Sequence, residues 1–115
     1  MVPPILLFVK YNKVIDFFKS IDRMLGYIEA IDVVNDEYEA VFDSVGNRIN
    51  IFGDLKENIC WADLGSNDKE AGRKLILEYY SEDTEYHSFT YEELVEHLVE
   101  NQGFIWWKFS ETISW

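Results

Sequence analysis

The sequence predicts one α+β domain: an antiparallel β-meander of three to five strands, with an N-terminal helix and two later helices packed on one face of the sheet. Two observations predict this class. Apolar residues recur at helical spacing near the N-terminus and again after residue 68, and between them, from 27 to 64, they alternate with polar residues. The 115 residues suffice for one hydrophobic core. No linker divides them, so residues 1–115 are expected to form a single domain.

The first helix is expected over residues 12–24. Apolar side chains recur there every three or four positions, with Lys and Asp between them. They are Val14, Phe17, Phe18, Ile21 and Leu25. Gly26 is suited to end this helix. The preceding apolar run, residues 5–9, fits either a short strand or an extra helical turn.

The middle of the chain has the two-residue period of strands. Residues 27–34 form one extended candidate, closed by the turn signal Asn35-Asp36. Residues 37–42 and 48–52 also alternate, and the short connection between them predicts a β-hairpin. Residues 58–64 are the next candidate strand. Links this short favour antiparallel neighbours, as in a meander.

A helix is predicted from about Asp68 to Tyr80. Asn67 and Glu70 approximate a capping box at its start, because Asn is a good N-cap and an acidic side chain follows three positions later. Residues 75–80 also fit a strand, so the sequence leaves that part of the helix open.

The last helix has the clearest start signal in the chain. Thr90 and Glu93 form a strict capping box, and apolar residues follow at helical spacing until Gly103. The tail from Phe104 to Trp107 has the composition of a strand. Neighbours in a strand point to opposite faces, so the sequence leaves open whether Trp106 or Trp107 is exposed.

Acidic charge is concentrated in residues 78–100. The chain has 22 acidic and 10 basic residues and a net charge of −12, and this stretch holds eight of the acids and no Lys or Arg. Like charges at that density repel, which indicates either a solubility role or a basic partner. Tyr and Phe lie among the carboxylates, and aromatic rings supply contacts at protein interfaces. The candidate partner-binding residues are Glu82, Asp83, Glu85, Tyr86, Glu92, Glu93, Glu96 and Trp107.

Several function classes are disfavoured by composition. The basic residues are scattered, which argues against direct binding of nucleic acid or of an anionic membrane. Cys60 is the only cysteine, so neither an intramolecular disulfide nor a cysteine-based metal cluster can form. We expect Cys60 to be a small buried side chain. The protein is expected to be cytoplasmic and to have no cofactor.

Two histidines offer the only candidate chemistry. Glu93 and His97 stand four apart on the last helix, so together they could contribute ligands to a metal, but no second motif completes a site. His87 lies in a segment expected to be a loop, and the sequence shows no nucleophile or substrate pocket near it. A small metal- or His-dependent enzyme is therefore the least favoured hypothesis. A homo-oligomer that pairs through the strand at Phe104–Trp107 is the second alternative.

Two segments resemble parts of a known class of proteins. They are the hairpin of residues 37–48 and the capped helix beginning Thr90-Tyr91-Glu92-Glu93-Leu94. In general build the chain resembles the small acidic immunity proteins that neutralise bacterial toxins. That resemblance implies stoichiometric inhibition of a basic partner, without turnover. The leading expectation is therefore a non-enzymatic acidic protein-binding module, monomeric or homodimeric, whose partner is a basic protein such as a toxin.

Overall fold

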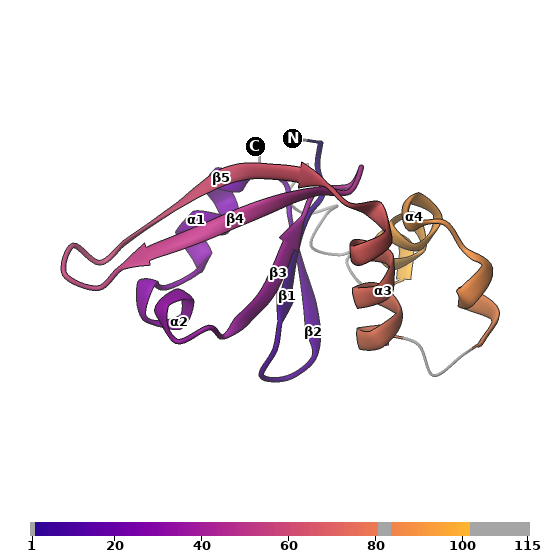
Figure 1. Ribbon diagram of the computed structural model, residues 1–115, viewed down its shortest axis with the longest axis horizontal. Coiled ribbons are helices and arrows are strands. Elements are labelled where there is room, and N and C mark those ends of the chain that lie inside the picture. Colours follow the sequence, from indigo (N-terminus) through magenta and orange to yellow (C-terminus); the bar gives the residue numbers. More distant parts are fainter. Residues whose placement is uncertain (1, 81–83, 102–115) are drawn as a thin grey trace.

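The computed structural model describes residues 2–80 and 84–101. It has an α+β fold with a five-stranded antiparallel sheet (Figure 1). The strands are β1 (Ile5–Val9), β2 (Val14–Phe18), β3 (Tyr38–Phe42), β4 (Asn47–Asp54) and β5 (Ile59–Asn67). The helices are α1 (Ile21–Tyr27), α2 (Ala30–Val34), α3 (Lys69–Tyr80), the 3-10 helix η1 (Thr84–Ser88) and α4 (Tyr91–Asn101).

The strand order is β2-β1-β3-β4-β5, so only β3 to β5 form the predicted meander. β1 lies between β2 and β3 and is antiparallel to both. Its residues are buried on both faces, which explains the uninterrupted apolar run Ile5–Val9. The sequence left open whether residues 5–9 form a strand or an extra helical turn, and the structure shows a strand.

Helices cover both faces of the sheet, and the expectation that they cover one face is wrong. Leu6 and Phe8 of β1 belong to a core cluster under α3 and α4, whereas Ile5 and Leu7 belong to a second cluster under α1 and α2. Figure 1 shows these two helix pairs on opposite sides of β1. Because successive side chains of β1 point to opposite faces and all are apolar, each face needs its own cover.

The predicted helix over residues 12–24 is wrong over residues 12–20. Lys13 has a φ of 53°, a left-handed conformation that interrupts a helix, and Val14–Phe18 pairs with β1 as strand β2. β-branched and aromatic residues favour strands, and this segment fits both periods. The helix, α1, begins at Ile21, where the Ser20 hydroxyl accepts a hydrogen bond from the Arg23 amide at 3.1 Å.

Residues 27–34 were expected to be extended, and this expectation is also wrong. They contain the end of α1 and all of α2, which packs against β4. Gly53 of β4 makes room for it, because a Cβ at that position would lie 2.9 Å from the carbonyl oxygen of Ala30. Contact with the sheet therefore decides this segment over its local period. The turn signal after it is confirmed, with Asp36 at a φ of 59°.

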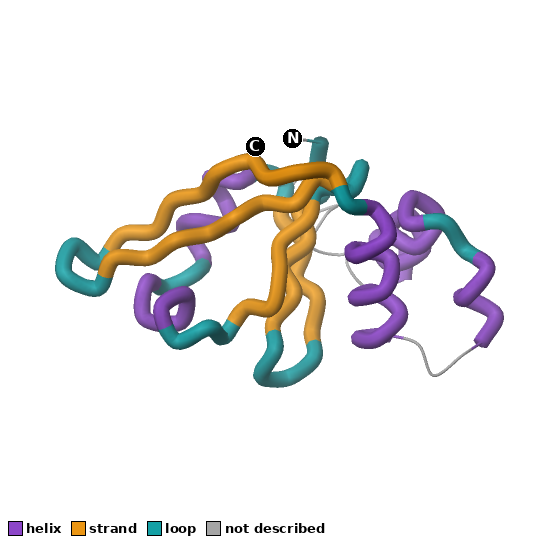
Figure 2. Tube along the Cα trace, in the orientation of Figure 1, coloured by secondary structure: helices purple, strands orange, loops and turns teal. Residues whose placement is uncertain are grey.

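The predicted hairpin is confirmed as β3 and β4, with Gly46 at a φ of 88° in the turn, where glycine is favoured. The aligned pair of these strands is Phe42 and Arg48. Beyond it they diverge, and β4 continues with the predicted strand β5 as a long two-stranded ribbon (Figure 2). A groove of about 280 Å³ opens where β3 and β4 separate.

The start of α3 differs from the predicted capping box. Asp68 is the residue whose Oδ1 accepts from a first-turn amide, that of Ala71 at 3.1 Å. Asn67 is the last residue of β5, and its side-chain amide instead donates to the Val45 carbonyl oxygen at 2.9 Å and to Asn47 Oδ1 at 3.1 Å. The strand alternative for residues 75–80 is excluded, because they are helical.

Candidate binding surface

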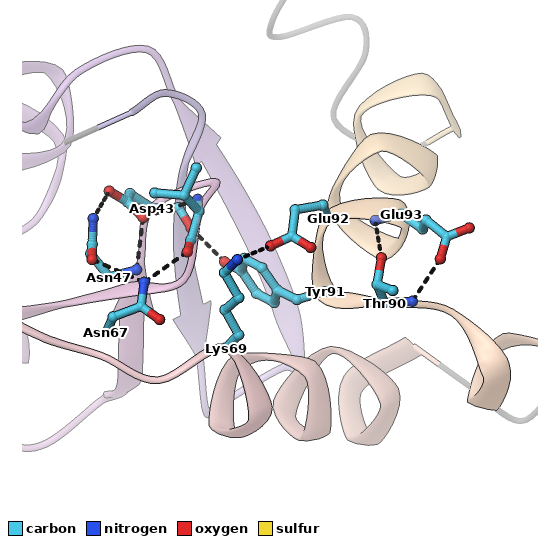
Figure 3. Close-up of polar contacts among 9 residues, drawn as sticks. Asp43, Asn47, Asn67, Lys69, Thr90, Tyr91, Glu92 and Glu93 are labelled. Atoms are coloured by element: carbon cyan, nitrogen blue, oxygen red, sulfur yellow. Dashed lines mark hydrogen bonds and ion pairs between the residues drawn. The ribbon is translucent and has the colours of Figure 1, made fainter.

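The capping box at the start of α4 is present with both of its hydrogen bonds (Figure 3). The Glu93 amide donates to Thr90 Oγ1 at 3.2 Å, and the Thr90 amide donates to Glu93 Oε1 at 3.0 Å. Hydrogen bonds from the Thr90 amide and the Thr90 side chain stabilise the ionised carboxyl group of Glu93 and lower its pKa. Helix α4 therefore begins where the sequence predicts.

Acidic side chains of α4 gather on its outer face. Tyr91, Leu94, Val95 and Leu98 are buried against the sheet and α3. The intervening carboxylates are exposed, because the helical period turns them away from the core. They are Glu92, Glu93, Glu96 and Glu100. We name these four residues the acidic face; it places the predicted Glu92, Glu93 and Glu96 on one helix surface.

The chain's own lysines neutralise part of the acidic stretch. Lys69 Nζ of α3 lies 2.8 Å from Glu92 Oε1 and lowers the pKa of that carboxyl group (Figure 3). Lys13 Nζ lies 3.1 Å from Glu78 Oε1. Both pairs are solvent-exposed, so their contribution to stability is small. The acidic field is consequently centred on Glu93, Glu96 and Glu100.

Tyr86 is placed beside α4 by η1. Its ring is half-buried, with its centroid 4.8 Å from that of His97 and 5.4 Å from that of Phe89. Phe89 meets Tyr86 edge-on, and both rings pack against the core cluster under α3 and α4. Tyr86 therefore borders the acidic face as a fixed ring.

Arg73 of α3 holds η1 in place, a role that the sequence did not reveal. Its Nε donates to the carbonyl oxygen of Phe89 at 2.8 Å, and its Nη2 donates to that of His87. Its Nη1 lies 3.4 Å from Glu70. Because its guanidinium group binds main-chain oxygens, Arg73 positions the aromatic border of the acidic face.

Four of the predicted partner-binding residues are not placed by this surface. Glu82, Asp83 and Trp107 lie outside the described residues, as does the predicted strand at Phe104–Trp107. Glu85 belongs to η1, but its side chain is not described. The described site therefore consists of the acidic face with Tyr86 at its border.

The structure does not place the histidines in a metal-binding cluster among the described residues. His97 is packed against aromatic rings, with its centroid 6.2 Å from that of Phe89. Among residues 2–80 and 84–101, no group of three His, Cys, Asp or Glu side chains is arranged to hold a metal ion.

Cys60 is partly buried on the α1/α2 face of β5, and burial raises the pKa of its thiol.

A second surface feature was missed by the sequence reasoning. Phe52 and Trp61 stack on the ribbon of β4 and β5, with ring centroids 5.7 Å apart, and both are exposed. A signal was present: Phe52 falls in the polar register of its strand, in step with Arg48 and Asn50. An aromatic residue at such a position is a candidate for surface exposure.

Comparison with protein-family models, with curated proteins and with solved structures found no match. Within the part of the chain that the structure describes, no helix has both the length and the apolar composition needed to cross a bilayer.

Proposed function

We propose that this chain is a non-enzymatic binding module whose acidic face captures a basic protein. The observation that carries the proposal is the exposed row Glu93, Glu96 and Glu100 on the outer side of α4. These carboxylates are spaced three and four residues apart, so they follow one helix face. A cationic protein surface approaching α4 meets them together.

The rigid attachment of α4 supports this role. Its inner face is buried in the core, and its first turn is fixed by the capping box. The row of carboxylates is therefore presented without ordering of the backbone on binding, which lowers the entropic cost of association. Long-range attraction by such a row raises association rates more than it strengthens the final complex.

Aromatic side chains supply the complementary contact. Tyr86 borders the acidic face and exposes part of its ring beside His97. Tyrosine is frequent among the residues that contribute most to binding, because its apolar ring and polar hydroxyl can both be satisfied at an interface. We infer that carboxylates steer the partner and that Tyr86 contacts it after docking.

On this proposal the protein acts stoichiometrically and has no turnover. The general resemblance to acidic immunity proteins supports the same mode, with a basic toxin as the kind of partner. A bound toxin would be inhibited by occlusion of its basic surface.

The experiment compares two variants that lose the same charge. Glu96→Gln with Glu100→Gln removes two carboxylates of the acidic face and leaves the capping Glu93 intact. Glu29→Gln with Glu57→Gln removes two exposed carboxylates remote from α4, near α2 and in the turn between β4 and β5. Basic proteins captured from a native lysate at low salt and released at high salt serve as the ligands for surface plasmon resonance.

We expect the association rate constant to fall several-fold for the α4 pair and its salt dependence to flatten. The remote pair should change both quantities much less. Equal effects of the two variants would show that net charge alone acts, and the absence of any salt-sensitive basic ligand would refute the proposal.

A further inference from the structure

The ribbon of β4 and β5 ends the sheet with an open edge. β5 is the last strand in the order β2-β1-β3-β4-β5, and it pairs with β4 from Asp54↔Ile59 to Asn47↔Asn67. Among the described residues, no strand pairs with the other side of β5. Figure 1 shows the turn of the ribbon at the end of the molecule opposite α4, whereas the other end of β5 leads into α3.

Within residues 2–80 and 84–101, helices cover one face of the ribbon and leave the other face open. Ile51 and Ala62 pack in the cluster under α1 and α2, whereas Phe52 and Trp61 alternate with them and point to the opposite face. Phe52 is 39% exposed and Trp61 is 44% exposed, although their rings stack on each other. Ile59 shares this face two residues before Trp61 and is also exposed. We name Phe52, Ile59 and Trp61 the ribbon patch.

The open edge carries little of the usual protection against pairing over residues 59–64, and the register shift between Leu64 and Asn67 is confined to its last residues. β5 has nine residues, no Pro and no Lys, and Asp63 is its one charged residue. Natural proteins commonly block long edges with lysine, proline, a bulge or a covering element, because exposed main-chain groups pair with other strands. The regular part of this edge, residues 59–64, is therefore open to pairing with another strand.

Charge selects the occupant. Residues 47–67 contain two basic residues, Arg48 and Lys56, and three acidic residues, Asp54, Glu57 and Asp63. Their net charge is −1, whereas that of the whole chain is −12. The ribbon therefore offers little attraction to the basic partner expected at α4. It is also the part of this acidic chain that a second acidic copy can approach with least repulsion.

We propose that two copies of the chain pair antiparallel along β5, so that their two five-stranded sheets join into one. A two-fold axis between the two β5 strands, perpendicular to the sheet, gives each strand the same donors and acceptors as its partner, which makes the contact self-complementary. The ribbon patches of the two copies then lie on one face of the joined sheet and shield each other from water.

The shape of the molecule keeps the acidic faces apart in such a dimer. The longest dimension is 46 Å, with the ribbon at one end and α4 at the other (Figure 1). Charges are screened over about 8 Å at physiological ionic strength. The two α4 helices would consequently lie well beyond the range of mutual repulsion, and both would stay accessible to partners.

Analytical ultracentrifugation of the full chain over a wide concentration range tests the dimer. We compare Trp61→Lys and Ile59→Lys, on the ribbon patch, with Val14→Lys, which places the same charge at an exposed apolar position on the other edge strand, β2. Circular dichroism and thermal melting establish that each variant is folded. Two patch variants are used so that misfolding of one leaves the test intact.

We expect the wild type and Val14→Lys to pass from monomer to dimer as concentration rises. Each patch variant should raise the dimer dissociation constant by about tenfold or more, because it places a cation in the contact. A wild type that stays monomeric throughout, or patch variants that dimerise as well as Val14→Lys, would overturn the proposal.

Amide hydrogen exchange identifies the occupant of the edge. Protection of β5 that grows with protein concentration supports the second copy. Protection that is complete in the monomer would assign the edge to the same chain's residues 102–115 and overturn the dimer. Raised salt should leave the dimer intact or strengthen it while it weakens capture of a basic protein, so this inference and the proposed function can fail separately.

Discussion

The hydroxyl group of Tyr91 donates a hydrogen bond to the main-chain carbonyl oxygen of Asp43 at 2.5 Å, across 48 residues of sequence (Figure 3). Tyr91 is the first residue of α4, and Asp43 follows β3 in the hairpin turn. Both are buried. The bond fixes the start of the acidic helix to the sheet, so the position of the candidate binding surface depends on it.

Tyr91→Phe tests this link. The substitution keeps the ring in its contact with Phe42 and removes only the hydroxyl group, which leaves one lone pair of a buried carbonyl without its donor. We expect the free energy of unfolding to fall by about 1 kcal/mol. Urea denaturation measures it, with Tyr11→Phe as the control, since Tyr11 is 85% exposed. Equal midpoints for the two variants would contradict this role.

The carboxylate of Asp43 organises the hairpin turn. It accepts hydrogen bonds from the main-chain amides of Val45 and Asn47 at 3.1 and 2.8 Å, and from the Asn47 side chain at 2.9 Å. It also accepts from the Val2 amide at 3.1 Å, which ties the N-terminal segment to the turn. Asp43 is fully buried, so these donors satisfy a charge that water does not reach.

Asp43→Ala is expected to lower the free energy of unfolding by roughly 3 kcal/mol, because several partly buried donors lose their acceptor at once. Asp54→Ala is the matched control. Asp54 also accepts from two main-chain amides in a turn, those of Lys56 and Glu57, but these bonds are solvent-exposed. Its loss should cost less than about 1 kcal/mol. Similar losses for both variants, measured by urea denaturation, would show that burial of Asp43 is not decisive.

Elements with strong local signals were predicted correctly. The β3–β4 hairpin follows from two alternating segments around Gly46, and α4 follows from the Thr90–Glu93 capping box. β2 was missed because Val14–Phe18 fits the helical and the strand period equally well. Its state is decided by pairing with β1, a contact that the local pattern does not encode.

The candidate site likewise combines features that follow from the local sequence with features that depend on tertiary contacts. Exposure of Glu93 and Glu96 follows from the helical period once α4 is recognised. The pairing of Glu92 with Lys69 depends on how α3 and α4 pack, and the anchoring of η1 by Arg73 depends on main-chain oxygens. Neither contact has a signature in the spacing of residues along the chain.

Gly72 marks the close contact between α3 and α4. A Cβ at this position would lie 2.6 Å from Cε1 and 3.1 Å from Cδ1 of Tyr91, whose ring is held by its bond to Asp43. We expect Gly72→Ala to destabilise the fold by about 1–3 kcal/mol, although alanine favours helices. Gly26→Ala in α1 meets no atom within 4 Å and should instead stabilise by up to about 1 kcal/mol. Thermal melting of both variants gives the two signs, and a stabilising Gly72→Ala would show that the helices can move apart.

Stability should decline at alkaline pH through the half-buried Tyr38. Burial, followed by the negative charge of Asp32, raises the pKa of Tyr38 to about 12 from its ordinary value of 10.0. Between these two values the unfolded chain releases the phenolic proton while the folded chain keeps it. The folded state then binds more protons, so the free energy of unfolding is unaffected below pH 10 and falls as pH rises above it.

The variant Tyr38→Phe removes this contribution. Its free energy of unfolding should fall less steeply between pH 10 and 12 than that of the wild type, as measured by urea denaturation at a series of pH values. The difference in tyrosinate absorbance between wild type and variant reports the titration of Tyr38 directly. A difference titration centred at 10.0 would show that the Tyr38 side chain is hydrated in the folded protein and that its surroundings do not disfavour the phenolate.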